Sequence, residues 1–159
     1  IASALAMGIV SPLCADAVND SSAGRFQTTS GRCLFSTSQG KDRGCRLIEI
    51  NGRSPTIISI RFIGAGDEPG SSQRLTFVVS TSEETPLLQC KRGSCKLETT
   101  SWVGSINSVS EATYDADGLA ESVPKAWPAG QGSCRLSSGR LSCQAETPGG
   151  GQLSAEAQL

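Results

Sequence analysis

The chain has 159 residues, enough for one domain with a hydrophobic core, and its 14 basic and 15 acidic residues nearly cancel. Charged residues are 18% and aromatic residues 4% of the chain, and glycine is plentiful, so short strands and turns are favoured over helices. Histidine is absent, which excludes the usual serine and cysteine protease triads, histidine zinc sites and histidine pH switches.

The first segment, residues 1–17, is predicted to be a signal peptide. It is mostly apolar, and Ala15-Asp16-Ala17 fits the small-x-small pattern of a signal peptidase site. The apolar run is shorter than the about 20 residues that a membrane helix needs. We expect a secreted or periplasmic protein that does not span a membrane. A first buried strand or helix, or a truncated membrane anchor, is the alternative.

A hairpin closed by cysteines is predicted next, in CLFSTSQGKDRGC, residues 33–45. Ser38-Gln39-Gly40 is typical of a three-residue loop with glycine in the left-handed position, so Cys33 faces Cys45. We name this hairpin finger 1. After a turn at Asn51-Gly52, strands are predicted at 56–63 and 73–82, opposite each other across a glycine-rich loop.

A second and tighter hairpin is predicted in QCKRGSCK, residues 89–96. With Arg92-Gly93 as a two-residue turn, Cys90 and Cys95 oppose each other at a non-hydrogen-bonded position. Side chains are close together at such positions, which suits a disulfide across the strands. We name this hairpin, residues 89–96, finger 2. A turn-rich interval at 102–105 and a strand at 106–114 are predicted after it.

The interval between the second and third hairpins contains two motifs with ordinary explanations. Asp115-Ala-Asp117-Gly118 resembles the start of a calcium loop, but Ala126 stands where the loop needs its glutamate, so a turn is the better interpretation. Ser122-x-x-Lys125 contains a proline and has none of the companion motifs of penicillin-binding enzymes. Trp102 and Trp127 are expected in the core, with a ligand platform as the alternative.

The last hairpin, finger 3, is predicted in GSCRLSSGRLSC, residues 132–143. With Ser138-Gly139 as a two-residue turn, hydrogen-bonded and non-hydrogen-bonded residue pairs alternate away from the turn. This alternation places Cys134 opposite Cys143 at a non-hydrogen-bonded position. A glycine-rich turn at 148–151 leads to a strand at 152–159 whose apolar residues alternate cleanly.

The cysteine count supports three local disulfides. Seven cysteines are present, and Cys14 lies in the predicted signal peptide, which leaves six. No CxxC pair occurs, and a secreted chain favours oxidation over metal binding. We therefore expect no metal site, no cofactor and these pairs: Cys33–Cys45, Cys90–Cys95 and Cys134–Cys143.

The closing cysteines of the three fingers are spaced 50 and 48 residues apart, which suggests repeated units. We expect about nine to eleven strands and no helix. The predicted fold of residues 18–159 is a single all-β domain, an antiparallel β-sandwich or partly closed barrel built of disulfide-stapled hairpins. The alternative is a β-trefoil-like arrangement of three units of about 49 residues.

Basic residues gather around the fingers, where Asp42 is the single acidic residue. If the fingers share one side of the domain, that side could contact an anionic glycan, lipid headgroups or an acidic protein surface. Basic side chains that keep exposed hairpins from aggregating are the alternative explanation. The residues are Arg32, Lys41, Arg43, Arg46, Lys91, Arg92, Lys96, Arg135 and Arg140.

These observations favour a non-catalytic binding or structural role in the cell envelope, and no catalytic residue can be assigned. The nearly neutral charge and the lack of an aromatic-basic motif argue against nucleic acid. One alternative is a hydrolase of envelope material that uses carboxylates the sequence does not identify. Another is a protease inhibitor that presents the basic loop of finger 2, although that loop is tight.

Overall fold

The computed structural model describes residues 22–159, and these residues form thirteen strands and no helix, so the predicted all-β class is confirmed. The predicted signal peptide, 1–17, lies outside the described residues. The strands are β1 (Gly24–Thr29), β2 (Cys33–Ser36), β3 (Asp42–Gly44), β4 (Leu47–Ser54), β5 (Ile57–Ala65), β6 (Ser72–Ser80), β7 (Leu88–Lys91), β8 (Gly93–Leu97), β9 (Ser101–Tyr114), β10 (Lys125–Pro128), β11 (Gln131–Ser137), β12 (Arg140–Glu146) and β13 (Gln152–Gln158).

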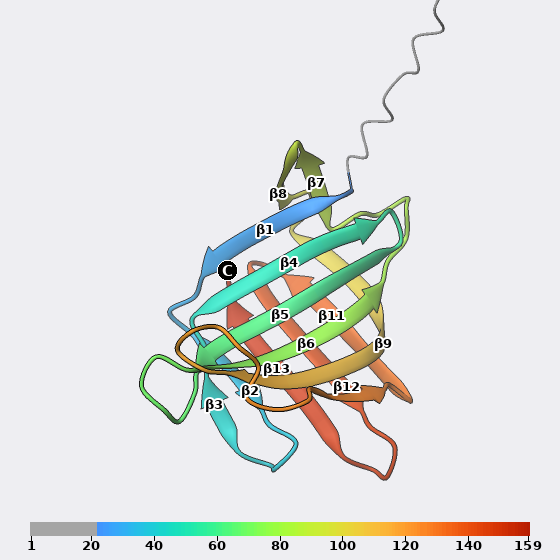
Figure 1. The fold of residues 1–159 in the computed structure, drawn as a ribbon. Helices are drawn as coiled ribbons and strands as arrows, with labels where there is room; N and C mark the ends of the chain where they lie inside the picture. The colour runs from blue at the N-terminus through green and yellow to red at the C-terminus, as the bar shows by residue number, and fades with distance from the viewer. Residues whose placement is uncertain (1–21) are drawn as a thin grey trace, which may run out of the picture.

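All described strands belong to one sheet, in the order β3-β2-β13-β12-β11-β9-β6-β5-β4-β1-β8-β7, with β10 beside β9. The pairs are antiparallel except β1 and β8, which are parallel, so the sheet is mixed. The sheet folds over itself into two layers, as Figure 1 shows. The strands β1, β4, β5, β6 and β9 cross over β2, β13, β12 and β11, and the sheet does not close.

The long strand β9 joins the two layers. It pairs with β11 over Ser101–Ser105, and with β6 from Ser105 to Tyr114. The turn expected at 102–105 is therefore wrong, and the reason is packing: a Cβ on Gly104 would lie 2.5 Å from the Trp102 ring and from Val79. The glycine provides room for the tryptophan ring rather than a change of direction.

The core lies between the layers. Ile50, Ile60 and Phe77 of one layer are fully buried together with Leu136 and Leu141 of the other. Strand β6 alternates buried and half-buried residues along its whole length, as expected of a strand with one face on a core. Trp102 belongs to this core with 3% exposure, as expected, whereas Trp127 is only half-buried at its edge.

The three predicted disulfides are present, with Cα–Cα distances of 4.9, 3.9 and 4.0 Å for fingers 1, 2 and 3. Such bonds are consistent with an extracellular or otherwise oxidising compartment. The register of finger 3 is also as predicted, with Ser137 opposite Arg140 and Cys134 opposite Cys143. In finger 1, Gly40 has a φ of 74° and its N–H donates to the Thr37 carbonyl, which confirms the three-residue loop.

The repeat of about 49 residues is not a structural repeat, and the β-trefoil-like alternative is wrong. In finger 3 the second arm, β12, pairs with the next strand, β13. The second arms of fingers 1 and 2, β3 and β8, do not pair with the strands that follow them, β4 and β9, so the three units are built differently. The similar spacing reflects similar turn chemistry in three different surroundings.

The turn expected at Asn51-Gly52 is also wrong, because both residues lie inside β4. The strand has a register shift between Gly52 and Ser54, and the chain reverses at Pro55 and Thr56 instead. A Cβ on Gly52 would collide with the backbone carbonyl of Ser22. This glycine therefore allows the chain that precedes β1 to approach β4 closely.

The turn of finger 3 gives a stability prediction. Ser138 has a φ of 50° and Gly139 one of 77°, the left-handed pair that Asn-Gly satisfies best in two-residue hairpins. We expect Ser138→Asn to raise the free energy of unfolding by roughly 0.5–1 kcal/mol in urea denaturation. Ser137→Asn is the matched control in the adjoining strand, and equal effects of the two substitutions would contradict the explanation.

The disulfides of fingers 2 and 3 are expected to act differently. Replacing Cys134 and Cys143 by alanine should lower the free energy of unfolding by about 2–3 kcal/mol, because both residues are buried in the core and close a loop. Finger 2 pairs with the rest of the sheet only at Gly24 and Arg25, so removing its disulfide should open the hairpin locally. Amide hydrogen exchange tests this, and loss of protection in β5 and β6 with finger 2 opened would contradict it.

Candidate functional site

Finger 2 projects from one end of the molecule and docks on the start of β1 (Figure 1). The contact is a short parallel pairing in which Gly24 faces Gly93 and Arg25 faces Ser94. A Cβ on Gly24 would lie 2.7 Å from the Gly93 backbone and 2.8 Å from the Cys95 sulfur. Glycine at position 24 therefore lets the hairpin lie directly against β1, and this brings Arg25 next to the basic residues of the finger.

The pairing creates a cluster of five basic side chains, all exposed, which we name the basic end. Arg25 also faces Asn51 of β4, and its Nε donates to Asn51 Oδ1 at 3.0 Å. Arg53 follows on β4, directly after the partner of Gly24. The basic end consists of Arg25, Arg53, Lys91, Arg92 and Lys96.

The charge of the basic end is not neutralised within the described part of the chain. Strands β1, β7 and β8 contain no acidic residue. Glu49 of β4 is buried and forms an ion pair with Arg61 at 3.1 Å. Glu83 and Glu84, in the loop before β7, and Glu98, directly after β8, are exposed, and none of them is in any of the ion pairs formed by residues 22–159. The basic end thus presents five positive charges to solvent.

The structure divides the nine basic residues that the sequence singled out, because the fingers lie at separate places in the sheet. Lys91, Arg92 and Lys96 stay together on finger 2, where Arg25 and Arg53 join them. These two arginines could not be assigned from the sequence, because no local spacing signals a parallel pairing between β1 and β8. The others are distributed over finger 1, finger 3 and their flanks: Arg32, Lys41, Arg43, Arg46, Arg135 and Arg140.

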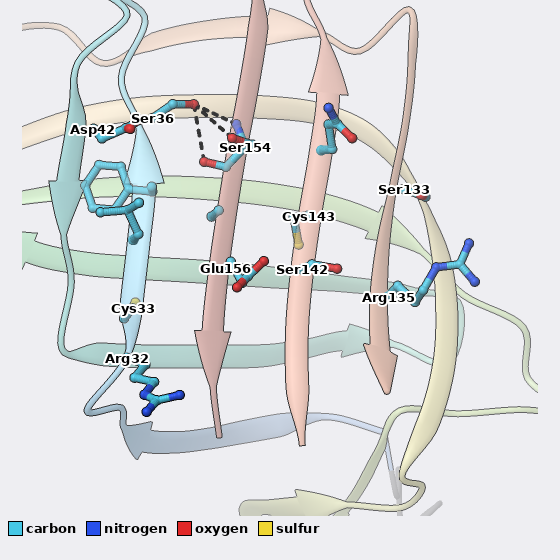
Figure 2. A pocket seen from close by; sticks show the side chains of 14 residues that line it. Arg32, Cys33, Ser36, Asp42, Ser133, Arg135, Ser142, Cys143, Ser154 and Glu156 are labelled. Atoms are coloured by element: carbon cyan, nitrogen blue, oxygen red, sulfur yellow. Dashed lines mark hydrogen bonds between the residues drawn. The ribbon is translucent and has the colours of Figure 1, made fainter. Parts of the chain in front are cut away.

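The outer face of β2, β13, β12 and β11 carries an open hollow of about 790 Å³, shown in Figure 2. Small polar side chains line it, among them Ser36, Ser142 and Ser154. Ser36 Oγ accepts a hydrogen bond from the Ser154 N–H at 2.9 Å and lies 3.3 Å from Ser154 Oγ. These bonds join β2 to β13, so part of the polar lining serves to hold the sheet together.

Two arginines of the predicted set, Arg32 and Arg135, line this hollow without an ion-pair partner among residues 22–159. Their strands are separated by three strand spacings, or roughly 14 Å. Figure 2 shows the Arg135 side chain directed away from Arg32. One small anion therefore cannot bind both guanidinium groups, and the hollow is a weaker anion site than the basic end.

The two carboxylates of the hollow come from different strands. Asp42 and Glu156 lie two strands apart and two residues out of register, roughly 12 Å between backbones. Arg140 Nη2 binds Glu156 Oε1 at 2.6 Å, on the side of Glu156 away from Asp42. This hollow gives the hydrolase alternative no support.

The tip of finger 1 is fastened to β9 and β6 by a carboxylate that the sequence did not single out. Glu111 Oε2 accepts the Ser38 N–H at 2.8 Å, and Glu111 Oε1 accepts a bond from Gln73 Nε2 at 3.0 Å. Gln73 is buried, which makes the pairing of its amide important for stability. Arg43 adds an ion pair to Asp67 at 2.8 Å, so this predicted binding residue is already engaged.

Other motifs have the ordinary roles expected of them. Asp115 Oδ1 accepts the N–H groups of Asp117 and Leu119, which confirms a turn. In finger 2, Arg92 has a φ of 52°, so its tip is not the extended loop that a protease cleft accepts. Within residues 22–159 no group of three or more metal-ligating side chains occurs, and no helix is long and apolar enough to cross a membrane.

Comparison with protein-family models, with curated proteins and with solved structures gives no match for this chain.

The role of Glu111 can be tested by two substitutions. Glu111→Ala leaves the Ser38 N–H and the Gln73 amide without their acceptor, and we expect it to cost about 1–3 kcal/mol of unfolding free energy. Glu111→Gln should cost less than half of that, because its amide oxygen can accept from Ser38 while Gln73 turns its own amide. Urea denaturation and exchange of the Ser38 amide measure both, and equal losses would contradict the assignment.

Proposed function

We propose that the protein is a secreted or periplasmic, non-catalytic binding domain that attaches to an anionic glycan through the basic end. The observation that supports the proposal is the gathering of five exposed basic side chains, none in an ion pair within residues 22–159, by the contact between finger 2 and β1. Binding of this kind requires no catalytic residue, and it gives a role to the positive charge gathered at the basic end.

The arrangement suits an extended ligand. Lys91 faces Ser94 on β8, Ser94 lies beside Arg25, and Arg25 faces Asn51 on β4. The row from Lys91 to Asn51 crosses three strand spacings, or roughly 14 Å. Repeated negative charges along a polymer can contact such a row at several points, whereas a single small anion can contact only part of it.

The rigidity of finger 2 supports binding. The Cys90–Cys95 disulfide closes the hairpin, and Leu87 and Leu88 at its base are buried in the core. Side chains on a fixed backbone lose less conformational entropy on binding than the same side chains on a flexible loop. The backbone that carries Lys91, Arg92 and Lys96 is therefore held in place before a ligand arrives.

A glycan is favoured over a lipid surface because, among residues 22–159, no exposed large hydrophobic side chain lies on β1, β7 or β8. The exposed large hydrophobic residues of the described chain lie on other elements. A domain that anchors in a bilayer interface usually inserts apolar side chains as well as binding headgroups. These exposed residues are Leu34, Val103, Leu119 and Val123.

The proposal predicts that heparin, a sulfated polysaccharide, binds the protein at low ionic strength and is released by salt. The triple substitution Lys91→Gln, Arg92→Gln and Lys96→Gln should weaken this binding by roughly tenfold or more, since each charge near an anionic surface contributes about 1 kcal/mol. Affinity chromatography with a salt gradient and titration calorimetry measure the change.

The matched control removes three exposed basic residues from elsewhere, by Lys41→Gln, Arg46→Gln and Arg135→Gln. This variant should bind nearly as well as the unmodified protein. Equal weakening by both variants would contradict a site at the basic end. Stronger binding to vesicles with an anionic lipid, or to polyglutamate, would instead assign the surface to a membrane or to an acidic protein.

A further inference from the structure

The tip of finger 1 and the β12–β13 turn lie at the end of the molecule away from finger 2 (Figure 1), and residues of both line a small pocket. Its volume is about 290 Å³, at the lower end of the range of about 300–1,000 Å³ for sites that bind small molecules. It is lined by Thr37, Ser38, Gly40, Trp127, Thr147, Gly151, Gln152 and Leu153.

Trp127 supplies an aromatic surface to this pocket. It lies on β10, opposite Val109 of β9, and packs against the core while remaining half-buried. Trp102, in contrast, is 3% exposed, and its indole N–H donates to Thr81 Oγ1 at 2.8 Å. The Trp127 indole N–H has no hydrogen-bond partner within residues 22–159. Part of this side chain is therefore available to a ligand.

The polar groups around Trp127 are also available. The Ser38 and Thr147 hydroxyls and the Gln152 amide make no side-chain hydrogen bond to another described residue. These three groups can donate and accept, so they suit hydroxyl groups as partners.

No charged residue lines the pocket, which distinguishes it from its surroundings. The neighbouring pocket of about 170 Å³ on the other side of finger 1 is lined by charged residues that include Arg43, Glu111 and Lys125. The hollow over β12 and β13 contains Arg135 and Glu156. Because the pocket at Trp127 offers only an aromatic ring and neutral polar groups, it favours an uncharged ligand.

Hydrogen bonds to the backbone hold two walls of the pocket in place. Glu111 holds the Ser38 backbone, so one wall is fastened to β9. The opposite wall is the turn after β12, where the Thr147 N–H donates to the Gly151 carbonyl at 2.8 Å and the Gly150 N–H donates to the Thr147 carbonyl at 3.2 Å. The side chains are thus held by backbone that is already ordered without a ligand.

We propose that this pocket binds a neutral sugar ring of an oligosaccharide. The apolar C–H face of the ring lies on Trp127, and its hydroxyls bond to Ser38, Thr147 and Gln152. A pyranose ring has both an apolar face and a rim of hydroxyls, which matches the aromatic side chain and the uncharged polar groups that surround it. The site is independent of the basic end, which lies on finger 2, β1 and β4.

The test uses the whole chain and a panel of neutral hexasaccharides of glucose, mannose, xylose and N-acetylglucosamine. Binding is measured by titration calorimetry and by tryptophan fluorescence. We expect at least one of them to bind and to change the fluorescence of Trp127, with little effect of salt because no charge is involved. Trp127→Ala should weaken binding by roughly tenfold or more, and Trp127→Phe should retain part of it.

Two further variants keep the test valid if Trp127→Ala lowers stability. Gln152→Ala removes an exposed polar group of the pocket and should weaken binding, whereas Gln89→Ala, an exposed glutamine on finger 2, should not. The triple finger 2 variant should also leave sugar binding unchanged. Failure of the whole panel to bind, or binding that survives both Trp127→Ala and Gln152→Ala, would overturn the proposal. Binding that disappears with salt would assign the ligand to a charged surface instead.

Discussion

The packing of Trp102 over Gly104 is the contact on which the two-layer arrangement depends. Strand β9 has to pair with β11 in one layer and with β6 in the other, so its backbone changes partners within a few residues. The large ring of Trp102 fills the corner that this change creates, and only glycine at position 104 leaves room for it. The bond from its indole N–H to Thr81 fixes the ring, so the corner has one conformation.

The disulfides contribute to this fold in a limited way, because those of fingers 2 and 3 each join two strands of one hairpin within one layer. The Cys33–Cys45 disulfide joins β2 to the short link between β3 and β4, twelve residues away in the chain. The layers are held together by the buried isoleucine, leucine and phenylalanine side chains between them. The fingers therefore stabilise the elements that display side chains, and the apolar core fixes those elements relative to one another.

The difference between local hairpins and long-range packing explains which features could be predicted from the sequence. The registers of fingers 2 and 3 follow from turn chemistry and strand parity, which act over a few residues, and both are correct. The basic end depends on the pairing of Gly24 with Gly93, residues that are distant in the chain and carry no turn signal. The glycines 52 and 104 were misjudged for the same reason: they make room for distant groups, and sequence analysis interpreted them as turns.

The two proposed sites are held in position by different contacts, so each can be disrupted separately. The basic end depends on the docking of finger 2 against β1, which involves two residue pairs of the sheet. The sugar pocket depends on the tip of finger 1, which Glu111 and Gln73 fasten to the opposite end of the core strands. Loosening one contact leaves the other in place, because β4, β5 and β6 lie between them as a continuous packed layer. The two proposed sites are therefore predicted to bind different parts of a glycan-rich material independently of each other.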